Sequence, residues 1–168
     1  MKLENILNIA KNNISKQIKD KFGNEYNSKI LRGTGHINDN NIIQTNNSYV
    51  EFDIYLDTNI GIGLYFGDVM NAIFGFEEQE DLIIFKQIQG ITGYDFWKRK
   101  KVYPKGLFNI NWREGMYSIM SDIFLNYGKN TSIISKQELS YNKVNDNNYD
   151  LLAKKLKLKF DEEKNMFI

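Results

Sequence analysis

Residues 49–66 read YVEFDIYLDTNIGIGLYF, and this stretch decides the fold class. Up to residue 56 apolar and polar side chains alternate, which is typical of a strand with one face in the core. Short Asn/Asp-rich breaks at 46–47 and 57–59 separate this run from apolar residues on either side. Such breaks between alternating runs indicate hairpins. We therefore predict a meander of three antiparallel strands, at about 41–45, 48–56 and 60–66.

Helical periodicity is found on both sides of this meander. Residues 3–22 carry an apolar stripe at helical spacing, and Gly23 follows as a stop signal. A second stripe within residues 112–127 ends at Gly128. After a polar linker, a third stripe at 149–160 predicts a C-terminal helix. The first helix is amphipathic, so we expect it to pack one face on the sheet.

The remaining segments are less regular. Residues 67–76, bounded by two glycines, predict a short helix. Residues 77–90 begin with acidic side chains that suit a helix or a strand, and their β-branched residues favour a strand. A further strand is predicted within 131–141. Together these elements predict an α+β fold, with an antiparallel sheet of about five strands, in a single domain over residues 1–168.

Composition removes several kinds of chemistry. The chain of 168 residues has no cysteine, one histidine (His36) and a net charge of +1. Disulfides, thiolate metal ligands and paired-histidine metal sites are therefore excluded. Polar residues interrupt the first apolar residues, so we predict no secretory signal and a cytoplasmic location. We expect neither a cofactor nor a metal. Abundant Asn, Ile and Lys are typical of an AT-rich microbial genome.

The strongest candidate for a binding surface is a basic and aromatic segment at 94–103. Trp, Tyr and Arg dominate the energetic centres of protein interfaces. Aromatic rings beside cations also stack nucleic-acid bases and neutralise phosphates. A surface turn whose aromatics anchor in the core explains the same residues without a ligand. The segment contains Tyr94, Phe96, Trp97, Lys98, Arg99, Lys100, Lys101 and Tyr103.

An acidic cluster precedes this basic segment in the chain. It consists of Glu77, Glu78, Glu80 and Asp81. Pairing between the two segments is the simplest expectation, although exposed ion pairs stabilise little. If the two lie apart, the surface is dipolar and steers charged partners. We therefore include the three glutamates among the candidate partner-binding residues.

Two carboxylates offer an enzymatic alternative. Glu51 and Asp53 share one face of a predicted strand, about 7 Å apart, a spacing that suits a divalent ion or an acid/base pair. The strand motif E-x-K of metal-dependent nucleases has a match at Glu162-x-Lys164, in a charged tail. A solvated strand face explains the two carboxylates equally well.

Taken together, the sequence favours a non-enzymatic protein-binding domain from a bacterial cytoplasm. We expect an immunity or inhibitor protein that neutralises a partner, such as a toxin, by covering its site with aromatic anchors and complementary charge. The first alternative is a carboxylate-based, metal-dependent nuclease or hydrolase that uses Glu51 and Asp53. The second is a nucleic-acid-binding protein that uses residues 94–103.

Overall fold

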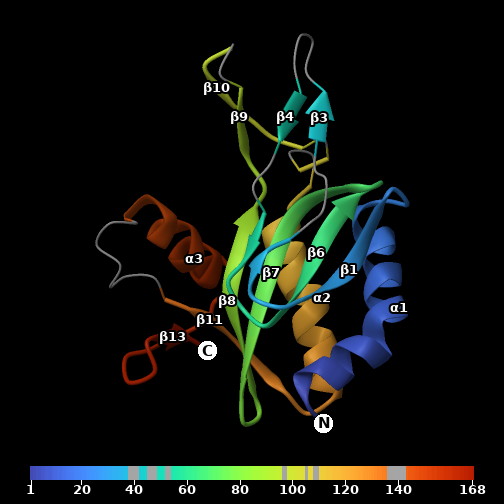
Figure 1. Cartoon of the computed structure of the whole chain (residues 1–168). Helices are drawn as coiled ribbons and strands as arrows, with labels where there is room; N and C mark the ends of the chain where they lie inside the picture. The colour runs from blue at the N-terminus through green and yellow to red at the C-terminus, as the bar shows by residue number, and fades with distance from the viewer. Residues whose placement is uncertain are drawn as a thin grey trace.

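A mostly antiparallel sheet forms the centre of the molecule (Figure 1). The computed structural model describes residues 1–37, 42–44, 49–51, 54–95, 98–104, 106–107, 110–135 and 143–168. Within these residues the sheet has seven strands, so the predicted α+β class is confirmed while the expected number of about five is too low. In spatial order the strands are β1 (Tyr26–Arg32), β6 (Ile60–Phe66), β7 (Val69–Gln79), β8 (Leu82–Gly90), β11 (Asn130–Ile134), β13 (Met166–Phe167) and β12 (Phe160–Asp161).

The strand pairing confirms one half of the predicted meander and not the other. The first hairpin forms, because Ile42–Gln44 pairs antiparallel with Tyr49–Glu51. β6 also forms as expected, but its neighbours in the sheet are β1 and β7, and none of the described residues within 48–56 pairs with it. That segment instead contributes to two small ribbons. Alternation identifies a strand and its buried face but not its neighbour, which explains the error. The ribbons pair β2 (Gly35–His36) with β5 (Tyr55–Leu56), β3 (Ile42–Gln44) with β4 (Tyr49–Glu51), and β9 (Gly93–Asp95) with β10 (Lys100–Val102).

The short helix predicted at 67–76 is wrong. Gly67, with φ of 58°, makes a tight turn, and β7 follows directly. β7 lies inside the sheet and is buried on both faces over residues 70–76, and after Asn71 the five residues 72–76 form a run without polar side chains. A continuous apolar run does not distinguish a buried strand from a buried helix. The strand expected within 77–90 is confirmed as the end of β7 and the whole of β8.

Two helices cover one face of the sheet. α1 (Leu3–Phe22) and α2 (Trp112–Asn126) match the first and second predicted helices, and they pack against each other and against β6, β7 and β8 in the main core. Six side chains of the α1 stripe are buried: Leu3, Ile6, Leu7, Ala10, Ile14 and Ile18. Among the described residues, no helix is both long and apolar enough to cross a membrane.

The third helix protects a sheet edge. α3 (Lys143–Lys155) begins and ends earlier than predicted, and its Tyr149 hydroxyl accepts a hydrogen bond of 2.8 Å from the Ile88 amide. Among the described residues β11 pairs with β8 only up to Phe85, so Ile88 lies beyond the part of β8 that β11 covers. The tyrosine thus satisfies a backbone donor that a strand would otherwise take.

The second face of the sheet carries a smaller core. It contains Leu31, Ile54, Leu56, Tyr65, Met70, Ile73 and Ile91. Gly63 of β6 faces this side, and a Cβ there would lie 2.8 Å from the ring of Tyr65. The trough left by this glycine is therefore filled by an aromatic side chain of the same strand. Gln87, 2% exposed, fixes the β5 segment here through hydrogen bonds with the backbone of Tyr55 and Asp57.

Candidate functional site

The basic segment forms the tip of the β9–β10 hairpin. Lys101 lies opposite Tyr94 in the ladder, and Lys98 and Arg99 lie in the turn between the strands. Arg99 has φ of 48°, a left-handed conformation typical of a tight turn. The side chains of all four residues 98–101 are exposed. The hairpin projects from one end of the molecule, as Figure 1 shows.

The aromatic part of the predicted surface is described only partly. Tyr103 is exposed and follows the last residue of β10, at the base of the hairpin. Trp97, Phe96 and the side chain of Tyr94 lie outside the described residues. The hairpin therefore brings together the backbone of Tyr94 with four cationic side chains and Tyr103.

The acidic cluster lies at the turn between β7 and β8. Glu77 forms an ion pair of 3.1 Å with Lys86 of β8. Glu78 forms one of 2.9 Å with Lys129 and also accepts a hydrogen bond from a backbone amide of α1. Glu80 is exposed in the turn itself, with φ of 54°. Glu77 and Glu78 are thus held by cations that the sequence interpretation did not consider.

The acidic and basic segments lie at opposite ends of the molecule. Figure 1 places the β7–β8 turn at the end away from the β9–β10 hairpin. The expected pairing between the two segments is therefore wrong for Glu77 and Glu78, which pair with Lys86 and Lys129. The long strands β7 and β8 explain the separation, because they carry the chain from one end of the sheet to the other.

Lys129 is a candidate site residue that the sequence analysis did not identify. It follows Gly128 at the end of α2, and its side chain is only 9% exposed. Its ammonium group contacts Glu78, lies 3.5 Å from Asp81 and donates a hydrogen bond of 2.8 Å to the Glu80 carbonyl. Nothing in the sequence indicates that this lysine, which follows a helix-ending glycine, contacts the β7–β8 turn, because the turn is distant from it along the chain.

The ion pair shifts both pKa values. Burial raises the pKa of the Glu78 carboxyl, but the Leu3 amide and the Lys129 ammonium lower it more, and the net pKa lies below the usual value. The hydrogen bond to Glu78 raises the pKa of Lys129 above its usual value, against the effect of burial. Each group therefore favours the charged form of the other.

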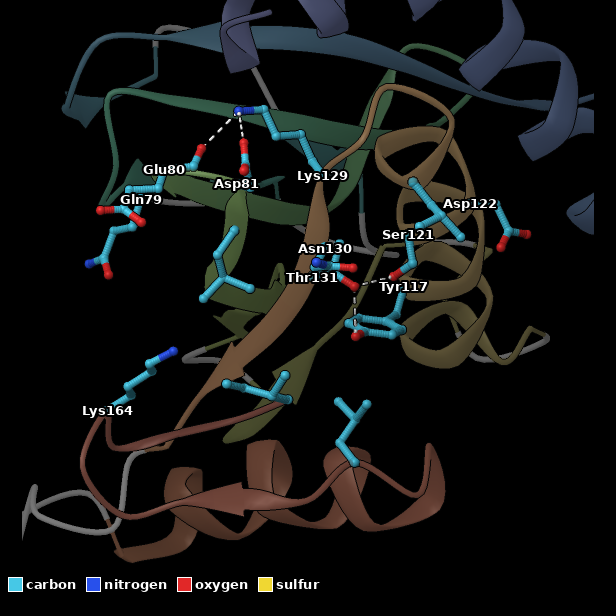
Figure 2. A pocket seen from close by; sticks show the side chains of 14 residues that line it. Gln79, Glu80, Asp81, Tyr117, Ser121, Asp122, Lys129, Asn130, Thr131 and Lys164 are labelled. Carbon is cyan, nitrogen blue, oxygen red and sulfur yellow. Dashed lines mark hydrogen bonds and ion pairs between the residues drawn. The ribbon is translucent and has the colours of Figure 1, made fainter.

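A hollow of about 760 Å³ lies beside this ion pair (Figure 2). Its walls come from the β7–β8 turn, α2, the first residues of β11 and the segment around β12 and β13. Figure 2 shows Asp81 and Lys129 on one side and Lys164 on another. Thr131 of β11 lies between them and joins its hydroxyl to those of Tyr117 and Ser121 at 3.0 Å each.

The carboxylate pair of the enzymatic alternative is not placed by the structure. Asp53 and the side chain of Glu51 lie outside the described residues. Lys164 lines the hollow, whereas its sequence neighbour Glu162 does not. Within the part of the chain that is described, no group of three or more His, Asp or Glu residues could hold a metal ion.

The single histidine has a structural setting. His36 is exposed in β2, and its ring meets that of Tyr55 edge-on at 5.2 Å. This contact joins the two strands of a ribbon, so a structural role accounts for His36. The charged hairpin and the hollow remain the candidate functional sites.

A scan against protein-family models found no match for this chain, and neither did searches of curated proteins and of solved structures.

Proposed function

We propose that this protein is a non-enzymatic binding protein of the immunity or inhibitor type, whose β9–β10 hairpin binds an acidic surface of a partner protein. One observation carries the proposal: four consecutive exposed cations at residues 98–101 occupy a projecting turn. Charges at the tip of a protrusion reach a partner before the rest of the surface does. Such charges raise association rates and select complementary partners.

The position of the acidic residues supports the proposal. Glu77 and Glu78 could have neutralised the cations from within the same chain, but they are bound by Lys86 and Lys129 at the other end of the sheet. An acidic partner that binds the hairpin therefore does not have to compete with Glu77 or Glu78. This is the arrangement expected of an inhibitor that recognises its target by charge.

The neighbouring backbone supports occlusion as the mechanism. β4 of the second hairpin contacts β9, so two hairpins extend side by side from the same end of the molecule (Figure 1). Two adjacent hairpins cover more of a partner than one turn does. A partner whose active site is acidic would lose access to its substrate when this end of the molecule binds over it.

Two variants of the full chain test the proposal. In the hairpin variant, Lys98, Lys100 and Lys101 become Gln, and Arg99 becomes Asn, which tolerates the left-handed backbone. The control variant replaces four exposed lysines elsewhere by Gln, so that both variants lose the same charge. The control positions are Lys11, Lys19, Lys154 and Lys159.

Each protein is immobilised and exposed to the proteins encoded beside its gene, and to a 20-base-pair DNA duplex, at 50 and 300 mM salt. We expect one acidic protein to bind the wild type and the control variant. Its association rate with the hairpin variant should fall about tenfold, and high salt should lower it for the wild type. Equal binding by both variants would refute the role of the hairpin. Binding of the duplex alone, lost in the hairpin variant, would replace the proposal by nucleic-acid binding.

A further inference from the structure

β1 is the outermost strand at one edge of the seven-stranded sheet, beside α1 (Figure 1). β6 pairs with β1 over its whole length on one side, and on the other side no strand among the described residues pairs with it. An edge strand presents a row of backbone N–H and C=O groups that suit pairing with a further strand. The hydrogen bonds at the two ends of β1 identify which residues carry these groups.

The hydrogen bonds at both ends of β1 involve odd-numbered residues. The Glu25 carbonyl accepts a bond of 2.8 Å from the Gly67 amide, and the Gly33 amide donates one of 2.9 Å to the Asn59 carbonyl. Because backbone groups alternate in direction along a strand, the even-numbered residues direct theirs away from β6. Within the described part of the chain no hydrogen bond reaches the outward groups of Ser28, Ile30 and Arg32.

The two cationic side chains at this edge are held by their own subunit. Lysine and arginine at an edge commonly prevent strands from pairing. Here the Lys29 ammonium lies over the ring of Tyr65 in β6, 4.6 Å from its centroid. Arg32 forms an ion pair of 3.2 Å with Glu4 of α1 and donates a second bond to Asn8. Neither cation therefore extends across the free backbone groups.

We propose that two copies of this chain pair through β1, antiparallel, about a two-fold axis at Ile30. In this register the two Ile30 residues lie opposite each other, and each Ser28 lies opposite Arg32 of the second copy. All outward groups of these three residues then form hydrogen bonds. A symmetric pair forms each contact twice, so a self-complementary strand favours a second copy over an unrelated segment. The dimer does not rest on the function proposed above, because β1 is separate from the β9–β10 hairpin.

Neighbouring registers fit less well. A shift of two residues in one direction places the two Lys29 side chains directly opposite each other, where like charges are destabilising. The same shift in the other direction leaves Ser28 opposite a position beyond Arg32, the last residue of β1. In the proposed register Lys29 lies opposite Leu31, so no two like charges face each other across the pair.

The two copies of α1 also meet in this arrangement. Hydrogen bonds join α1 to β1 at Asn8 and at Ser15, so the helical turn between them lies over the centre of the edge. Asn12 shares this side of the helix and is exposed, and its amide can both donate to and accept from its counterpart in the second copy. Lys11 is the only charged residue between Asn8 and Ser15, and its stem is long enough to direct the ammonium to solvent.

The wild-type chain provides the first test. Light scattering measures its mass from micromolar to submillimolar concentration, and amide hydrogen exchange by NMR measures the edge. We expect the mass to approach twice that of one chain, with the Ser28, Ile30 and Arg32 amides protected only at high concentration. The Lys29 and Leu31 amides bond to β6 and should be protected throughout. A single-chain mass at every concentration, or a dimer that leaves the even-numbered amides unprotected, would overturn the proposal.

A matched pair of variants tests the backbone pairing itself. Ser28→Pro removes an outward N–H that the β1–β6 ladder does not use, so the sheet should tolerate it. Symmetry removes this bond twice, and dimerisation should weaken about thirtyfold or more. Ser28→Ala loses the same hydroxyl contact with Ser15 but keeps the N–H, so it should dimerise as the wild type does. Circular dichroism at low concentration checks that both variants fold. Equal dimerisation of the two variants would refute the pairing.

Two further measurements distinguish β1 from other contacts. Backbone pairing is between neutral groups, so raised salt should not weaken the dimer, and the variant neutralised at residues 98–101 should dimerise as the wild type does. A dimer that dissociates in salt or in that variant is held by charge, which would overturn the proposal. Protection of the even-numbered amides only after addition of a cell lysate would assign the edge to another protein and would overturn it as well.

Discussion

The most demanding stability test concerns Gln87, a buried polar side chain of β8. Its amide nitrogen donates a hydrogen bond of 2.8 Å to the Tyr55 carbonyl, and its amide oxygen accepts one of 3.0 Å from the Asp57 N–H. These bonds hold the backbone on either side of Leu56 on the second face of the sheet. This segment pairs β5 with β2 and leads back to the β3–β4 hairpin. Gln87→Leu keeps the volume of the side chain and removes both bonds.

The expected loss follows from the two hydrogen bonds. Each contributes about 1 kcal/mol to the free energy of unfolding, and the Tyr55 carbonyl and Asp57 amide lose part of their solvation as well. Because leucine has a similar volume, no large cavity adds to this cost. We expect a total loss of about 2–3 kcal/mol. For a chain of this size, that loss lowers the melting temperature by about 4–12 °C.

Urea denaturation followed by circular dichroism measures the global effect, and hydrogen exchange of the Asp57 amide measures the local one. The matched control is Gln89→Leu, because Gln89 is exposed on the same strand and loses only a contact with Gln87. We expect a lower urea midpoint and faster exchange at Asp57 in the first variant alone. An unchanged midpoint together with an unchanged Asp57 exchange rate would show that the segment is held by other contacts, and the reasoning would fail.

Two further outcomes are expected. Gly61→Ala should lower the free energy of unfolding by about 2 kcal/mol or more in urea denaturation. An alanine Cβ at this position would lie 2.4 Å from the Phe74 carbonyl oxygen and would force β6 away from β7. A urea midpoint equal to that of the wild type would contradict this close approach. The folded-state pKa of Glu78 is depressed, so its contribution to stability is present above the ordinary value of 4.5 and is lost as pH falls through the lower folded-state pKa. The difference in urea midpoint between wild type and Glu78→Gln should therefore shrink between pH 5 and 3, and a constant difference would count against the ion pair with Lys129.

Periodicity predicted the helices better than the sheet. α1 and α2 each lay one apolar stripe on the core, so the spacing of their apolar residues is visible in the sequence. β7 is buried on both faces and has no alternation to reveal it. β1 is an edge strand that buries Tyr26 on one face and Leu31 on the other, so its sequence shows no clear alternation either. Neither a two-sided nor a sparsely buried strand matches the pattern of a half-buried one.

The candidate surfaces were predictable in composition and not in position. The four cations at residues 98–101 are consecutive, so the sequence alone identifies them. The hollow joins the β7–β8 turn, α2 and β11, which are far apart in the chain. No residue type in these segments indicates that they lie beside one another, so only the three-dimensional structure reveals the hollow.

β8 relates the two surfaces to each other. It begins beside the acidic turn at Leu82, and after Gly90 only two residues separate it from β9. Along this length β8 is paired with β7, and Ile83 and Phe85 are buried in the main core. Close-packed cores deform little, so the distance between the two ends is fixed. A partner that contacted both the cationic hairpin and the acidic turn would have to present an acidic and a basic group at that separation, which is a stricter requirement than either charge alone.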